Sequence, residues 1–173
     1  MKKISKSAQE TLKLGKRIAS NLRGGEIILL SGELGTGKTV LAKGIAQGLG
    51  IDKNDVCSPT FVLLRVYPGE RLLQHFDLYR IKGPEDISAL GYQEYLYSEA
   101  VTLIEWPERL KYLLPKEFLK IKLASKAKNQ RFIEFSAKGS RYKKLLEKIT
   151  RLAPSGYPAL KPPRGLRLKR KKV

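Results

Sequence analysis

The sequence predicts an α/β domain of three layers, with helices on both faces of a sheet that mixes parallel and antiparallel strands. Short aliphatic runs alternate with segments of helical periodicity in the first half of the chain, which is typical of buried parallel strands joined by helices. Two β-rich pairs, each joined by a short polar turn, add antiparallel strands. At 173 residues the chain is long enough to bury one core without a disulfide or a bound metal.

The first half begins with a predicted helix and continues as strand, loop and helix. Ser7 and Glu10 have the spacing of a capping box, and apolar residues follow at helical intervals until a pair of glycines. Residues 26–31 (EIILLS) form an aliphatic run bounded by glycine, so we expect a strand buried on both faces. From Lys38 apolar residues recur at helical spacing until two further glycines, which predicts the second helix.

The second half is predicted to supply the antiparallel strands and the last helices. Residues 60–67 and 71–78 are β-rich and are joined by Pro-Gly-Glu, so they indicate a hairpin. A short helix is expected from Pro84. The remaining predicted elements are a strand at 101–105, a strand pair at 118–124 and 131–136, and a helix at 140–149.

The turn between the first strand and the second helix carries the strongest chemical signal. Residues 32–39 (GELGTGKT) fit G-x-x-x-x-G-K-[ST] at every defined position, so the domain is predicted to be of the P-loop NTPase type. The glycines let backbone N–H groups and the helix N-terminus point at phosphate oxygens. Lys38 is then expected to bridge the β- and γ-phosphates, and Thr39 to give its hydroxyl to Mg²⁺.

Two carboxylates at strand ends are the candidate partners of this loop. Glu105 follows four largely apolar residues, and it is the candidate acid that holds Mg²⁺ directly or through water. Asp77 ends the second hairpin strand, where alternation places His75, Asp77 and Tyr79 on one face. That face is either solvated or orients the attacking water or a metal-bound water.

Several nearby residues each have two interpretations. Thr60 is either a switch-loop threonine that reaches Mg²⁺ or the γ-phosphate, or part of an ordinary turn. Trp106 is either a core residue or a sensor of nucleotide or partner, and Arg80 pairs with phosphate or with an acid elsewhere. We expect Cys57 to be a small buried apolar residue, and we do not expect His75 to be a metal ligand.

The charge balance indicates a polyanionic partner. The chain holds 35 Lys and Arg residues against 16 Asp and Glu, a formal net charge of +19. Residues 151–173 carry eight basic side chains, four prolines and no acid, so we expect a flexible basic arm after a domain at 1–150. RNA phosphates, an acidic protein surface and a purely solubilising role all stay open for this arm.

Other classes of protein are excluded by what the sequence lacks. One cysteine and one histidine cannot form an intramolecular disulfide or a structural zinc site. The longest aliphatic runs are far shorter than the roughly 18 residues of a membrane span, and the basic start is not a secretory signal. We therefore expect a cytoplasmic protein. A guanine-reading [NT]-K-x-D motif is missing, which favours ATP over GTP.

Five linked motifs together resemble the TsaE (YjeE) family over residues 7–150. The resemblance implies a small bacterial ATPase that assists N6-threonylcarbamoyladenosine (t6A37) formation in transfer RNA. It implies that ATP-Mg hydrolysis supports turnover of the TsaD and TsaB proteins, while this chain neither builds nor transfers the threonylcarbamoyl group. The motifs are GELGTGKT, SPTF (58–61), HFDLYR (75–80), LGYQEYL (90–96) and LIEWPERL (103–110).

The resemblance also assigns roles to individual residues. It implies metal binding by Thr39 and Glu105, and switch and catalytic roles for Thr60 and Asp77. The proline-rich basic arm departs from the family pattern, so its role cannot be inherited, and direct transfer RNA contact through the arm or the basic surface stays open. The implied nucleotide-binding residues are Leu34, Gly35, Thr36, Gly37, Lys38 and Thr39.

Two other classes of protein remain as alternatives to an ATPase. A small-molecule kinase would use the same P-loop, but it should also show an arginine-rich lid, and no convincing lid segment is visible in the sequence. An RNA-binding module would explain the charge but not the P-loop with its acidic partners. ATP turnover without an added acceptor separates a hydrolase from a kinase.

Overall fold

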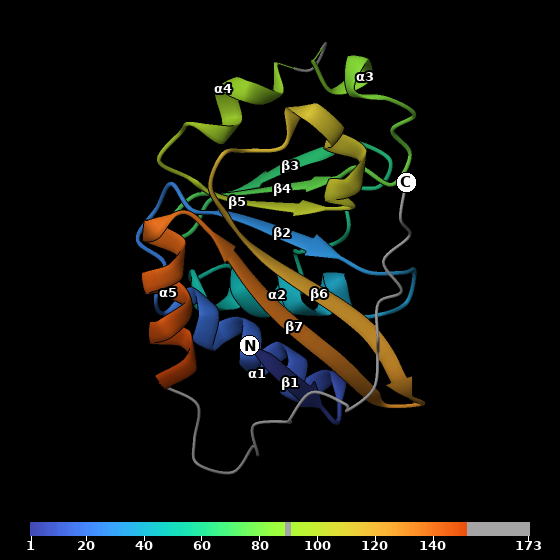
Figure 1. Ribbon diagram of the computed structural model, residues 1–173, viewed down its shortest axis with the longest axis vertical. Helices are drawn as coiled ribbons and strands as arrows, with labels where there is room; N and C mark the ends of the chain where they lie inside the picture. Colours follow the sequence, from blue (N-terminus) through green and yellow to red (C-terminus); the bar gives the residue numbers. More distant parts are fainter. Residues whose placement is uncertain (89–90, 152–173) are drawn as a thin grey trace, which may run out of the picture.

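The computed structural model describes residues 1–88 and 91–151 (Figure 1). They form a seven-stranded sheet flanked by helices. The strand order across the sheet is β1-β7-β6-β2-β5-β4-β3. The strands are β1 (Lys2–Ser5), β2 (Ile27–Ser31), β3 (Leu64–Tyr67), β4 (Leu73–Asp77), β5 (Val101–Glu105), β6 (Phe118–Ala127) and β7 (Gln130–Lys138).

The centre of the sheet is parallel and its two sides are antiparallel. Strand β2 pairs in parallel with β5 and β6, and β5 pairs in parallel with β4. Strands β1, β7 and β3 add antiparallel pairs at the two sides. Every residue of β2, β4 and β5 is buried, as expected of strands covered on both faces. The predicted mixed sheet is confirmed.

Helices cover both faces of this sheet, which confirms the three-layer prediction. Ile28 and Leu30 of β2 pack into one apolar cluster with α1, α2 and α5, while Ile27 and Leu29 pack into another with α3, α4 and η1. The helices are α1 (Ala8–Ala19), α2 (Lys38–Gly48), α3 (Pro84–Ser88), α4 (Tyr92–Leu96), the 3-10 helix η1 (Pro107–Leu113) and α5 (Ser140–Arg151).

Helices α1 and α2 pack backbone against backbone through glycine. A Cβ atom at Gly44 would lie 2.3 Å from the Leu12 carbonyl oxygen, and one at Gly15 would lie 2.6 Å from the Leu41 carbonyl oxygen. Both distances are shorter than real contacts, so only glycine allows this approach. Because α2 begins directly after the loop of residues 32–37, the predicted nucleotide loop, the contact fixes the position of that loop at the end of β2.

Some boundaries differ from the prediction. The hairpin strand expected from residue 60 begins at Leu64, because residues 60–63 turn, with Leu63 at a φ of 66°. The last helix extends to Arg151, so the first residue of the predicted arm is helical, and the remainder, 152–173, lies outside the described residues. Strand β1 and the helices α4 and η1 were not predicted. In the described part of the chain no helix is long and apolar enough to cross a membrane.

Candidate nucleotide-binding site

The connection from β2 to α2 has the form that phosphate binding requires. Gly37 precedes the first residue of α2 with a φ of 96°, a left-handed conformation that favours glycine. Thr36 is buried, and its hydroxyl donates to the Glu33 carbonyl at 2.8 Å, which ties the loop to itself. Leu34 at the crest is 76% exposed. The first amide groups of α2 have no partner within the helix, and such groups can bind an anion.

Lys38 lies inside the loop rather than in solvent. Its ammonium group donates to the carbonyl oxygens of Gly32 at 2.8 Å and Glu33 at 2.9 Å, which uses two of its three N–H donors. The Nζ atom also lies 4.1 Å from the centre of the Trp106 ring, a cation–π contact. Burial lowers the pKa of Lys38, and the carboxylates of Glu105 and nearby acids oppose that shift. The third donor has no hydrogen-bond partner among the described residues.

Thr39 and Glu105 meet although they are far apart in the sequence. The Thr39 hydroxyl donates to Glu105 Oε1 at 3.2 Å, and His75 Nε2 contacts the same oxygen at 3.0 Å. Both Glu105 and His75 are buried. A carboxylate oxygen that accepts this contact requires the tautomer of His75 with its proton on Nε2. His75 thus holds the Glu105 carboxylate in place, a partnership that the sequence did not reveal.

The Asp77 carboxylate accepts hydrogen bonds from three donors. Thr60 donates to Oδ2 at 2.6 Å, Ser58 donates to the same oxygen, and the Tyr79 amide donates to Oδ1 at 3.0 Å. Asp77 is paired with Glu105 in the register of β4 and β5, so the two carboxylates are neighbours across the sheet. The structure brings Thr60, Asp77, Glu105 and the P-loop together, while their roles stay predictions. Ser58 was missed as a partner because nothing in its spacing pointed to Asp77.

Several side chains were also assigned an environment from the sequence, and the structure shows where each of them lies. The alternative that the face of His75, Asp77 and Tyr79 is solvated is wrong for His75 and Asp77, which are buried, whereas Tyr79 is 42% exposed. Cys57, expected to be buried, is exposed, while its neighbours Val56 and Pro59 point inward. Arg80 lies over the Phe61 ring at 5.0 Å, and the structure gives it no acidic partner among the described residues.

Trp106 packs partly against the core, and its role as a sensor stays a prediction. It is only half-buried, at the end of β5, with a left-handed φ of 59°. Its ring lies 5.1 Å from the Tyr79 ring as well as against Lys38. The indole therefore packs against the apolar layer on one side and borders the loop on the other.

The donor set at Thr39 and Glu105 suits Mg²⁺. One hydroxyl and one carboxylate oxygen converge there, and Mg²⁺ in nucleotide sites typically takes few protein oxygens together with phosphate and water. Within the described ranges no group of three or more His, Cys, Asp and Glu residues forms a metal cage. The residues present thus fit a metal that is held jointly with a nucleotide.

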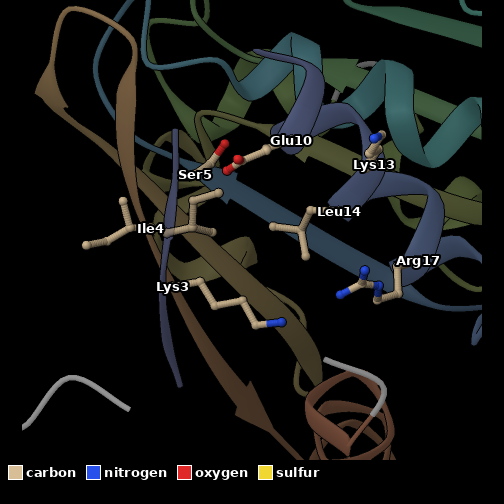
Figure 2. A pocket seen from close by; sticks show the side chains of 8 residues that line it. Lys3, Ile4, Ser5, Glu10, Lys13, Leu14 and Arg17 are labelled. Atoms are coloured by element: carbon tan, nitrogen blue, oxygen red, sulfur yellow. The ribbon is translucent and has the colours of Figure 1, made fainter. Parts of the chain in front are cut away.

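A separate small cavity lies between β1, α1 and β7. It has a volume of about 90 Å³, and none of the predicted site residues lines it. Lys3 and Arg17 extend toward one another across this cavity from β1 and α1 (Figure 2). Burial, and then the charge of Arg17, lowers the pKa of Lys3. This hollow is distinct from the nucleotide loop.

Comparison with known proteins gives one consistent result. The family model "Threonylcarbamoyl adenosine biosynthesis protein TsaE" matches residues 5–133. The tRNA threonylcarbamoyladenosine biosynthesis protein TsaE of Treponema pallidum (strain Nichols) is 41% identical over 133 residues, 77% of this chain and 98% of that protein. The protein of the same name from Bacillus subtilis (strain 168) is 38% identical over 144 residues, 83% of this chain and 89% of that protein.

The structure of the chain is also similar to a solved crystal structure. The structure described as "Crystal structure of Bacillus subtilus YdiB" superimposes with a TM-score of 0.75 at 34% sequence identity. The match covers 87% of this chain and 94% of that chain.

Proposed function

The chain belongs to the TsaE family, whose members act in the biosynthesis of threonylcarbamoyladenosine in transfer RNA, and from this premise we propose that it is an ATPase using ATP with Mg²⁺. The single observation that carries the proposal is the contact of Thr39 with Glu105 at the end of a complete P-loop. A loop of this sequence and shape binds the phosphate chain of a nucleotide, and the adjacent acid completes a metal site.

Phosphate binding is the task of the loop. The loop of residues 34–39 offers backbone amides, and the first turn of α2, which has no side-chain cap, adds the positive end of its dipole. The remaining donor of Lys38 binds the β- and γ-phosphates. Because Lys38 is already fixed by two carbonyl oxygens, little side-chain entropy is lost when the nucleotide arrives.

Thr39 and Glu105 hold Mg²⁺ in this proposal. Their oxygens lie 3.2 Å apart, and His75 fixes the orientation of the carboxylate. When bound, Mg²⁺ neutralises the charge on the β- and γ-phosphate oxygens. The proposed metal ligands lie next to the phosphate-binding loop because Thr39 directly follows Lys38 at the start of α2.

Asp77 is proposed to position the attacking water. Its carboxylate lies beside Glu105 in the sheet and accepts a hydrogen bond from water in the same way that it accepts from Thr60. The water oxygen forms a bond to the γ-phosphorus as the bond to the β–γ bridging oxygen breaks, which yields ADP, inorganic phosphate and a released proton. Thr60, which donates to Asp77 at 2.6 Å, is proposed to follow the γ-phosphate as a switch residue.

The exposed apolar residues near the site support a protein partner. Leu34 in the P-loop is 76% exposed, and Phe61, which follows the Asp77 partner Thr60, is 85% exposed. Large exposed apolar side chains beside a functional site are typical of a protein interface. We propose that TsaD and TsaB are these partners, in the cytoplasm, and that the basic surface and arm contact transfer RNA.

The decisive experiment measures phosphate release from ATP by the purified protein without an acceptor, followed by capture of TsaD and TsaB with and without ATP. Hydrolysis that stays slow alone and rises with the partners supports the proposal. A small-molecule kinase would need an acceptor before it consumed ATP. If neither ATP nor ADP bound, the proposed function would be overturned.

A further inference from the structure

An arginine on β7, two strands away from β2 in the sheet, reaches the nucleotide loop. A Cβ atom at Gly37 would lie 3.5 Å from Nε of Arg131, so the guanidinium stem touches the loop where α2 begins. Arg131 belongs to β7 and is 94 positions away in the sequence. No motif identified it.

The sheet explains how Arg131 arrives there. Strand β6 runs beside β2, with Lys122 opposite Ser31, and the Leu123 carbonyl oxygen would lie 2.2 Å from a Cβ atom at Gly32. The β6–β7 hairpin therefore packs directly on the nucleotide loop (Figure 1). Arg131 lies opposite Ser125, beside a register shift in β6, and such irregularities re-aim side chains.

Alternation along β7 directs Arg131 toward α2. Ile133 and Phe135 have the same parity, and both belong to the apolar cluster that contains α1 and α2. Arg131 continues this face one step beyond the core, to the level of the first turn of α2. The guanidinium is thus on the face of the sheet that α2 covers, beside Gly37.

The charge of Arg131 has no partner among the residues that the structure describes. Neither a hydrogen bond nor an ion pair involves its side chain there, and its strand neighbours Ser5 and Ser125 are uncharged. The residue is half-buried, and arginine keeps its charge in proteins. A half-buried guanidinium that lies against a phosphate loop is stabilised most by phosphate, which it can grip through two parallel N–H bonds.

We propose that Arg131 binds the phosphate chain of the nucleotide at the Gly37 side of the loop. This inference rests on the proposed function and deepens it. The chain then supplies within its own sheet a positive charge that many P-loop ATPases receive from a partner. Arg131 and Lys38 grip the phosphates from different elements, β7 and α2.

The test is calorimetric titration of the full chain and its variants with ADP and with AMP. Arg131→Ala should raise the Kd for ADP about 10-fold or more, since hydrogen bonds to charged groups are worth that much, and should affect AMP less. Arg131→Lys should recover part of the affinity, because the charge returns without the paired geometry. Lys128→Ala, an exposed change in the same hairpin, should leave the Kd unchanged.

Thermal unfolding without nucleotide separates binding from folding. The Arg131→Lys variant should melt as the wild-type chain does, so its partial recovery cannot reflect restored stability. A wild-type Kd for ADP in Arg131→Ala would overturn the Arg131 role alone, and so would an equal loss in Lys128→Ala. Failure of the wild-type chain to bind ADP or ATP would overturn the proposed function as well.

Discussion

The Thr39 hydroxyl donates a hydrogen bond to the Glu105 carboxylate across 66 positions of sequence. The contact exists because β2 and β5 are parallel neighbours, with Leu30 opposite Glu105. Their carboxyl ends meet at one edge of the sheet, where α2 also begins. The sheet topology, rather than any local motif, creates this site.

Replacement of Glu105 should separate catalysis from binding. Glu105→Ala removes the carboxylate that holds the metal, so the hydrolysis rate should fall on the order of 100-fold, while the loop amides still bind nucleotide. Steady-state rates beside isothermal titration check this, with Glu108→Ala, an exposed acid nearby, as the control. Normal turnover in Glu105→Ala would remove the residue from the site.

Asp77 should be equally important for the rate. Asp77→Ala removes the acceptor for water, and it also leaves the hydroxyls of Ser58 and Thr60 without their partner. We expect a loss of about 100-fold or more in hydrolysis and near-normal nucleotide affinity. Asp77→Asn keeps the shape, so it tests the charge. An Asp77→Asn enzyme with wild-type rates would show that the residue is structural.

Lys38 should be required for the nucleotide but not for the fold. Lys38→Ala should abolish measurable ATP binding, whereas Lys43→Ala, later in the same helix, should not. Burial lowers the pKa of Lys38 below its usual 10.5, so the unfolded chain binds more protons between the two values. The free energy of unfolding should therefore rise with pH in that window, and less so in Lys38→Ala.

The glycine contact between α1 and α2 predicts a stability effect. Gly44→Ala forces a methyl group to 2.3 Å from the Leu12 carbonyl oxygen, so the helices must separate. We expect a loss of about 1–3 kcal/mol in the free energy of unfolding by denaturant titration. Because α2 carries Lys38 and Thr39, nucleotide affinity should weaken too. Unchanged stability would mean that the helices shift without cost.

Deletion of residues 152–173 tests the arm. This segment holds seven basic residues and no acid. If it binds RNA, the slope of log affinity against log salt should flatten by up to about 6 units on deletion, equally for substrate and non-substrate transfer RNAs. ATP hydrolysis should not change, because the P-loop and both acids precede the deletion. Identical RNA binding curves would exclude RNA as the partner of the arm.

The sequence predicted those elements whose structure depends on residues close together in the chain. The aliphatic strand β2, the P-loop and the start of α2 follow from residue spacing alone, and the structure confirms them. Strand β1 escaped prediction because its four residues, three of them polar, become a strand only through pairing with β7. The helix α4 is one turn long, so packing of Tyr92 and Leu96 rather than propensity stabilises it.

Side-chain partnerships across the sheet could not be predicted. The contact of His75 with Glu105 depends on the register of β4 against β5, which no sequence pattern reports. Cys57 was assigned to the core from the usual behaviour of its residue type. In the structure its backbone amide bonds the Tyr67 hydroxyl at 3.4 Å, while the thiol faces solvent.

The exposed thiol of Cys57 allows a distance to Trp106 to be followed by fluorescence energy transfer. The sequence contains one cysteine and one tryptophan, so a maleimide dye can label only Cys57 and ultraviolet excitation selects Trp106. Cys57 directly precedes the Ser58–Thr60 turn, and Trp106 lies against Lys38 in the loop. Energy transfer between indole and dye would therefore follow the motion of the turn relative to the loop in real time, in the wild-type protein, without an engineered probe.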